Sequence, residues 1–173
     1  MSRFLVFLVL TASPLIAQTA GTPHLAFPTD GNWVNQQTEL QNHARKILKS
    51  ELSRRLGPTC DMRTLSKIDF GNCFIADAAI TQRNYRAFAQ ALKGSLAVPV
   101  PNFDPEVYPA AKTFTAAEVA WRSYMEKTCD ALGITEHSGT ETGMDVTACQ
   151  RSLTRQHMKD LGNIFLGPYD IYQ

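Results

Sequence analysis

Four cysteines limit what this chain of 173 residues can fold into more than any other feature. They are Cys60, Cys73, Cys129 and Cys149, and in an exported chain an even set of cysteines predicts disulfides. A metal site is the rival interpretation, but no pair has the Cys-x-x-Cys spacing that zinc sites favour, and the histidines are scattered. We therefore expect two disulfides and no metal centre.

The N-terminal segment predicts export. Arg3 is followed by an apolar run over residues 4–10 and then by residues up to Ala17, which is the pattern of a signal peptide spanning residues 1–17. Cleavage after Ala17 is preferred and cleavage after Ala20 is the second choice. The run is shorter than the roughly 20 residues of a membrane span, and no cysteine near the cleavage points could carry a lipid. We expect a periplasmic or secreted protein without a stable membrane anchor.

The next segments predict a lead-in followed by a helix. Residues 18–36 show little periodicity and are expected to form a flexible lead-in. In residues 37–57, apolar side chains between Thr38 and Leu56 recur at spacings of three and four, which indicates an amphipathic helix. The helix should end at the Gly-Pro pair of residues 57–58, because proline cannot continue it.

Three more helices are expected after this one. Their apolar positions predict helices over Cys73–Leu96, Thr115–Leu132 and Thr147–Phe165. Prolines make residues 98–109 a non-helical connector, and residues 133–146 are expected to form an exposed loop. Thr115 and Glu118 are spaced as a capping box at a helix start. The predicted fold class is all-α, a small disulfide-bonded bundle of about four helices with a Pro-rich connector.

This helix pattern selects one of the three possible disulfide pairings. Cys129 falls in the last turn of one expected helix and Cys149 in the first turn of the next, so the loop between them brings them together. Cys60 is then left for Cys73. On a chain-entropy model each bridge stabilises the fold by roughly 3 kcal/mol.

The sequence contains no recognisable catalytic motif. There is no Gly-x-Ser-x-Gly elbow, phosphate loop or dinucleotide fingerprint, and Glu126 and Asp130 are spaced like an ordinary solvated helix face. His157 lies on the apolar side of the last helix, where a structural histidine is expected. We predict a protein that is not an enzyme and has no cofactor. A formal net charge of +1 for the whole chain also argues against nucleic acid as a partner.

Several residues in the three later helices together resemble the lysozyme inhibitor LprI-like domain family. The motif residues other than cysteines are Asn84, Tyr85, Trp121, Tyr124, Leu153, Thr154 and Leu161. Ala-Trp leads into Cys129, and Cys149 precedes the Leu-Thr pair. The resemblance covers about Cys60 to Leu161 and assigns residues 58–173 to one helical domain of this type, while the helix at 37–57 lies outside the pattern. Here His157 stands where the family has arginine, Tyr85 follows Asn84 directly, and the Pro-rich connector is longer than usual.

The resemblance implies a compact disulfide-bonded helical fold that binds and inhibits lysozyme in the cell envelope. An inhibitor needs a protruding element and no catalytic groups, and an acidic surface favours encounter with a basic lysozyme. The candidate is the loop of residues 133–146, whose candidate binding residues are Glu136, His137, Ser138, Glu141 and Asp145.

Two alternatives remain open. The loop of residues 133–146 could be a solubilising loop that merely spans the disulfide. The protein could also be an envelope module that binds peptidoglycan or a partner protein through the basic residues of the first helix, for which a solvated helix face is the simpler interpretation. These residues are Arg45, Lys46, Lys49, Arg54 and Arg55.

Overall fold

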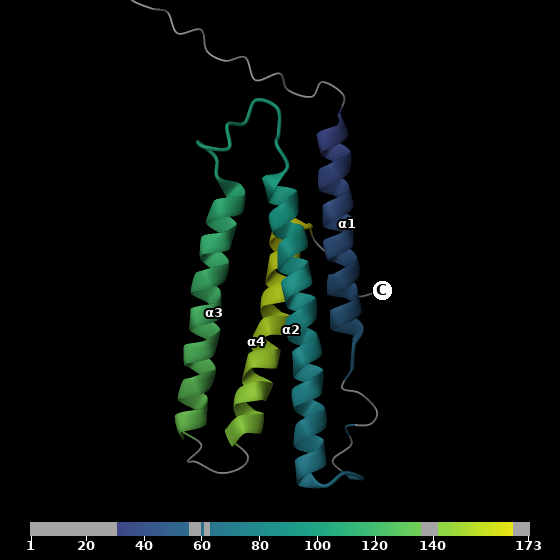
Figure 1. Cartoon of the computed structure of the whole chain (residues 1–173), viewed down its shortest axis with the longest axis vertical. Coiled ribbons are helices and arrows are strands. Elements are labelled where there is room, and N and C mark those ends of the chain that lie inside the picture. Colours follow the sequence, from purple (N-terminus) through teal and green to yellow (C-terminus); the bar gives the residue numbers. More distant parts are fainter. Residues whose placement is uncertain (1–30, 56–59, 61–62, 136–141, 168–173) are drawn as a thin grey trace, which may run out of the picture.

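The computed structural model describes residues 31–55, 60, 63–135 and 142–167. It contains four helices in this part of the chain, α1 (Asn32–Ser53), α2 (Lys67–Ala97), α3 (Ala110–Thr135) and α4 (Thr142–Phe165) (Figure 1). The predicted all-α bundle is therefore confirmed. None of these helices offers a stretch that is long and apolar enough to cross a bilayer.

The long helix α2 organises the bundle, because α1, α3 and α4 all contact it (Figure 1). α1 runs antiparallel to α2, so that Gln37 lies near Ser95 and Glu51 lies near Thr81. α4 runs in the same direction as α2 and also packs on α3 and α1. Between the described residues α1 and α3 do not meet, so α2 and α4 separate them.

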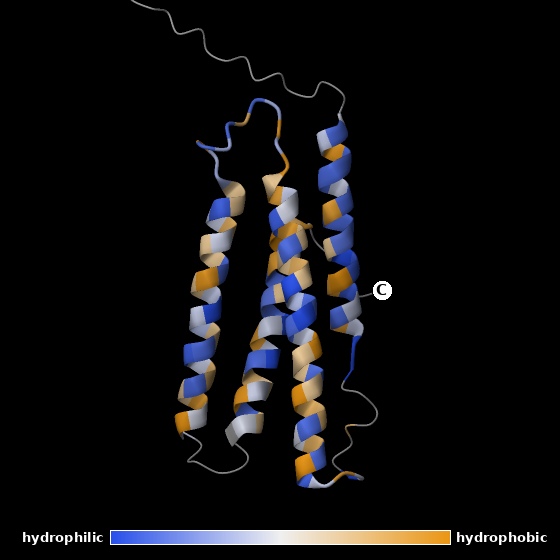
Figure 2. Ribbon diagram, in the orientation of Figure 1, coloured by the Kyte–Doolittle hydropathy of each residue, from blue (hydrophilic) through white to orange (hydrophobic). Residues whose placement is uncertain are grey.

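Apolar side chains from all four helices form the core. Apolar and polar residues alternate along each helix, so that each helix has a side that can be buried against its neighbours (Figure 2). Leu48, Phe88, Leu92 and Met158 are fully buried at the centre, and Phe114 of α3 joins the same cluster. Burying side chains of this size contributes roughly 1.5–3 kcal/mol each.

Both predicted disulfides are present. Cys60 pairs with Cys73 and Cys129 pairs with Cys149, with a Cα–Cα distance of 5.6 Å in each case. The start of α2, the end of α3 and the start of α4 meet at one end of the bundle, which is the lower end in Figure 1, and both bridges lie there. We call this region the disulfide end and define it by residues 63–75, 129–135 and 142–149.

The first helix begins earlier than expected. We predicted a flexible lead-in up to residue 36, but α1 starts at Asn32. Trp33 is partly buried, and the side chain of Gln37 donates a hydrogen bond to the backbone oxygen of Ser95 at the far end of α2. The lead-in prediction was therefore wrong for residues 32–36, because packing against α2 outweighs the weak local periodicity. Gly31 lies at the N-cap position of α1, and residues 18–30 lie outside the described residues.

The predicted capping box was also wrong. α3 begins at Ala110, and the Thr115 hydroxyl lies inside the helix, where it donates to the backbone oxygen of Ala111 at 2.7 Å. Glu118 is buried rather than folded back on a helix start. The true start follows directly after Pro109, whose backbone oxygen accepts from Thr113.

Helices α2 and α4 are longer than the periodicity predicted. α2 begins at Lys67, one residue after Ser66, whose hydroxyl accepts from the backbone N–H of Asp69 as an N-cap. α4 begins at Thr142, and α3 continues to Thr135, so the expected loop of residues 133–146 was too long. Helical structure replaces the loop from both sides, which leaves residues 136–141 between the two described segments.

Candidate functional site

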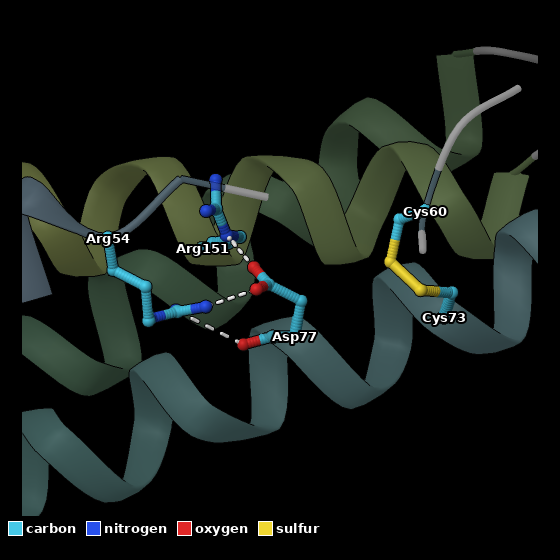
Figure 3. The surroundings of a disulfide bond; sticks show 5 residues. All are labelled: Arg54, Cys60, Cys73, Asp77 and Arg151. Atoms are coloured by element: carbon cyan, nitrogen blue, oxygen red, sulfur yellow. Dashed lines mark hydrogen bonds and ion pairs between the residues drawn. A yellow bond between two sulfur atoms is a disulfide. The ribbon is translucent and has the colours of Figure 1, made fainter. Parts of the chain in front are cut away.

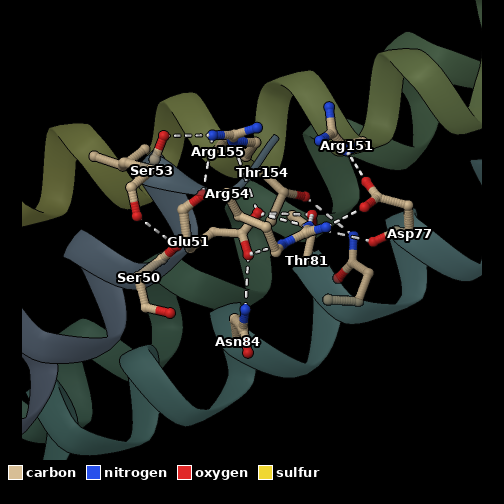
Figure 4. A network of polar contacts seen from close by, with 12 residues as sticks. Ser50, Glu51, Ser53, Arg54, Asp77, Thr81, Asn84, Arg151, Thr154 and Arg155 are labelled. Atoms are coloured by element: carbon tan, nitrogen blue, oxygen red, sulfur yellow. Dashed lines mark hydrogen bonds and ion pairs between the residues drawn. The ribbon is translucent and has the colours of Figure 1, made fainter. Parts of the chain in front are cut away.

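A buried polar network joins the C-terminal end of α1 to α2 and α4 (Figure 4). At its centre lies Glu51, whose side chain is fully buried. The Glu51 carboxylate accepts from Thr81 Oγ1 at 2.8 Å and from Asn84 Nδ2 at 2.7 Å. The Arg54 guanidinium donates to both carboxylate oxygens, each at 3.0 Å. The carboxylate is therefore held by donors from α2 and from the chain just after α1.

The second carboxylate of the network is Asp77 of α2. It accepts from Arg54 and, at 2.7 Å, from Arg151 of α4. Arg155 completes the network by donating to the backbone oxygens of Glu51 and Leu52 at 3.0 and 2.9 Å. The Cys60–Cys73 bridge lies one helical turn before Asp77, so the disulfide and the network together fasten the chain after α1 onto α2 (Figure 3).

The pKa shifts in the network follow from these contacts. Burial alone would raise the pKa of Glu51, but hydrogen bonds from Arg54, Asn84 and Thr81 outweigh it and lower that pKa. Burial and the neighbouring Arg151 lower the pKa of Arg155. Among the described residues no buried side-chain nitrogen or oxygen lacks a partner. The hydrogen-bonding capacity of the network is thus satisfied, which suits a structural role.

A second polar cluster joins α2, α3 and α4. The Tyr85 hydroxyl donates to Glu118, and His157 Nε2 lies 2.8 Å from the other oxygen of that carboxylate. The Trp121 ring stacks on the His157 ring with centroids 4.0 Å apart. Burial and the neighbouring Glu118 raise the pKa of Tyr85 well above its ordinary value, so the hydroxyl stays protonated. His157 therefore has the structural partners expected of it.

The motif residues of the suspected family lie in these two clusters or beside them, with one exception. Asn84 belongs to the Glu51 network, while Tyr85 and Trp121 pack together with ring centroids 5.1 Å apart. Thr154 is fully buried and accepts from the Gln82 side chain at 3.0 Å. Leu161 is buried and Leu153 is partly buried. The exception, Tyr124, is 59% exposed and contributes nothing to either cluster.

The disulfide end carries an apolar cavity of about 540 Å³. Its apolar lining comes from the start of α2, the segment before it and the start of α4, and consists of Leu65, Phe70, Phe74, Met144 and Ala148. Lys67 and Asp145 add opposite charges to the lining. Two apolar side chains of the same end are strongly exposed, Ile68 at 76% and Ile134 at 80%.

Only part of the predicted binding loop can be placed. Glu136, His137, Ser138 and Glu141 lie outside the described residues. Asp145 does not lie in a loop; it is exposed in the first turn of α4 and lines the cavity. The apolar part of this surface was not predicted, because Ile68, Phe70 and Ile134 fall outside the helices that the periodicity indicated.

The basic residues of the first helix are divided between the interior and the surface. Arg54 lies in the buried network, and Arg45 donates to the backbone oxygen of Leu166 at 2.8 Å. Lys46, Lys49 and Arg55 are exposed. The continuous basic face that a peptidoglycan-binding helix would need is therefore interrupted.

We found no match to this chain among protein-family models, curated proteins or solved structures. Within the described ranges, no group of three or more His, Cys, Asp or Glu side chains is placed to hold a metal ion. The surface of the chain itself offers one clear candidate, the disulfide end with its apolar cavity and exposed apolar side chains.

Proposed function

We propose that this protein is an exported binding protein of the lysozyme inhibitor LprI-like type, and that its disulfide end docks on a lysozyme-like muramidase. The observation that carries the proposal is the apolar surface of the disulfide end, which combines the 540 Å³ cavity with the exposed side chains of Ile68 and Ile134. Exposed apolar surface of this kind marks a contact site for a partner. The motif residues that resemble the family support the choice of partner.

Rigidity supports a binding role for this end. The Cys129–Cys149 bridge joins the end of α3 to the start of α4, and Cys60–Cys73 joins the preceding chain to α2. A surface held in its bound shape loses less conformational entropy on association, so more of the contact energy appears as affinity. Both bridges would also be stable in the oxidising compartment that the predicted signal peptide implies.

The charge of the disulfide end favours a basic partner, since its carboxylates, Asp69, Asp130 and Asp145, outnumber its cations, Arg63 and Lys67. Asp145 lies exposed at the edge of the apolar cavity, and Glu136 and Glu141 follow α3 closely in the sequence. Acidic groups around an apolar contact speed encounter with a basic enzyme such as lysozyme and suppress contact with acidic proteins. The proposed mechanism is occlusion of the enzyme's groove, which requires no catalytic residue from the inhibitor.

The test is a lysis assay. Purified oxidised protein is added in increasing amounts to lysozymes of different structural classes, and the clearing of a cell-wall suspension is followed. We expect saturable inhibition of at least one class, reaching its plateau near one protein per enzyme. Unchanged lysis by every class at large molar excess would refute the proposal.

A further inference from the structure

A second cavity, of about 440 Å³, lies in the cleft between α2 and α3. The α2 side contributes Tyr85, Arg86 and Lys93, and the α3 side contributes Glu118 and Arg122. Arg86 and Lys93 are seven residues apart on one helix, so they lie two turns apart on the same face, about 10 Å from each other along the axis. The volume is in the range of small-molecule sites, which is roughly 300–1,000 Å³.

The acidic group of the cleft is already engaged. Glu118 is 8% exposed, and its two oxygens are taken by the Tyr85 hydroxyl and by His157. The stacked Trp121 ring holds His157 in place behind it. This wall of the cleft is therefore preorganised, and both oxygens of the Glu118 carboxylate have partners other than the exposed cations of the rim.

Among the residues that the structure places, the cations of the rim have no acidic partner. Arg86 donates there only to the backbone oxygen of Gln82, at 3.3 Å. Within the part of the chain that the structure describes, Lys93 and Arg122 make no hydrogen bond and no ion pair. The cleft thus holds three exposed cations against one carboxylate that is bound elsewhere, and this excess of positive charge attracts anions.

We propose that the cleft between α2 and α3 binds a small anion that carries carboxylate or phosphate groups. The two guanidinium groups face the cleft from opposite helices, and each can donate two parallel hydrogen bonds to one such group. Lys93 adds a point charge farther along α2. This site lies away from the disulfide end, so its loss leaves the proposed contact with lysozyme unchanged.

Equilibrium dialysis tests the proposal directly. Purified oxidised protein is dialysed against radiolabelled citrate and, separately, against radiolabelled inorganic phosphate, with sodium chloride keeping the ionic strength constant. We expect saturable binding of at least one probe with one site per chain. Preference for citrate would assign a carboxylate ligand, and preference for phosphate would assign a phosphorylated one.

Matched variants locate the bound anion. Arg86→Gln and Arg122→Gln should each weaken binding about tenfold, because each removes charge-assisted hydrogen bonds. Arg83→Gln removes the same charge from an exposed position of α2 that does not line the cavity, and it should leave binding unchanged. The absence of saturable binding of both probes, or an equal loss in Arg83→Gln, would overturn the proposal. Circular dichroism spectra of all three variants confirm that they are folded.

Discussion

Glu51 shows how a fully buried charge is accommodated in a small helical protein. Its carboxylate has donors from Arg54, Thr81 and Asn84, so the cost of removing it from water is offset by specific contacts. Removing one member of such a group is costly, because the remaining charges stay buried without a partner.

We expect Glu51→Gln to lower the free energy of unfolding by about 3 kcal/mol, since Arg54 then loses one of its two ion-pair partners, Glu51 and Asp77. Glu39→Gln removes the same charge from an exposed position of α1 and should change that free energy by less than about 0.5 kcal/mol. Urea unfolding followed by circular dichroism measures both. Equal effects of the two substitutions would show that the network does not stabilise the fold.

The same carboxylate makes the fold sensitive to acid. The pKa of Glu51 lies below its ordinary value of 4.5 in the folded protein. A carboxyl group whose pKa is lowered by folding stabilises the fold above the unfolded-state pKa, and this contribution disappears as pH falls through the folded-state pKa. We expect the free energy of unfolding to decline below pH 4.5 and the decline to be shallower in Glu51→Gln. Urea titrations at a series of pH values test this, and an identical decline in the variant would contradict it.

Sequence patterns predicted the environment of some single residues and missed that of others. His157 was correctly expected to be structural, because it lies on an apolar helix face. Arg54 was taken for part of a solvated basic face, yet it turns inward just after α1 ends. Its partners Asp77 and Thr81 come from α2, so no local pattern around residue 54 could reveal them.

Among the elements, α1 and α4 approach each other closely at Gly162. A Cβ atom built there would overlap the end of the Leu48 side chain, which is fully buried. Interiors are packed densely enough that such an overlap must move a helix or distort a rotamer.

We therefore expect Gly162→Ala to lower the free energy of unfolding by about 1–3 kcal/mol. Gly143→Ala is the matched control, because nothing lies within 4 Å of a Cβ atom at this helical position. It should be neutral or stabilise α4 by up to about 1 kcal/mol, since alanine is the better helix former. Thermal unfolding of both variants measures these changes in stability. A stabilised Gly162→Ala protein would mean that α1 does not pack tightly on α4.

At the scale of elements, periodicity predicted the existence of all four helices but not their ends. The disulfide pairing followed because Cys129 and Cys149 were placed at neighbouring helix ends. The start of α3 was missed because Thr115 and Glu118 imitate a local cap, whereas Glu118 is bound by Tyr85 and His157 from other helices. The start of α3 depends on these contacts between helices, which the periodicity of apolar residues does not predict.

In the whole molecule, the polar network and the core lie inside the bundle, whereas apolar side chains are exposed at the disulfide end. The saturated polar network and the apolar core join α1, α2 and α4, while the disulfide end presents apolar side chains next to Asp145. The cysteines placed the proposed binding surface at this end, but its apolar character appears only when α2 and α4 lie side by side. Close packing there is evident at Gly71, where a Cβ atom would lie 3.2 Å from the Met144 sulfur.

Two variants at opposite ends of the bundle test whether the disulfide end docks on lysozyme. Ile134→Asp places a charge on the disulfide end, and Val107→Asp makes the same kind of change in the connector, where Val107 is 63% exposed. Titration calorimetry should show that Ile134→Asp weakens binding at least about tenfold, as loss of an interface anchor does, while Val107→Asp binds like the unchanged protein. Undiminished binding by Ile134→Asp, or a selective loss in Val107→Asp, would contradict the account.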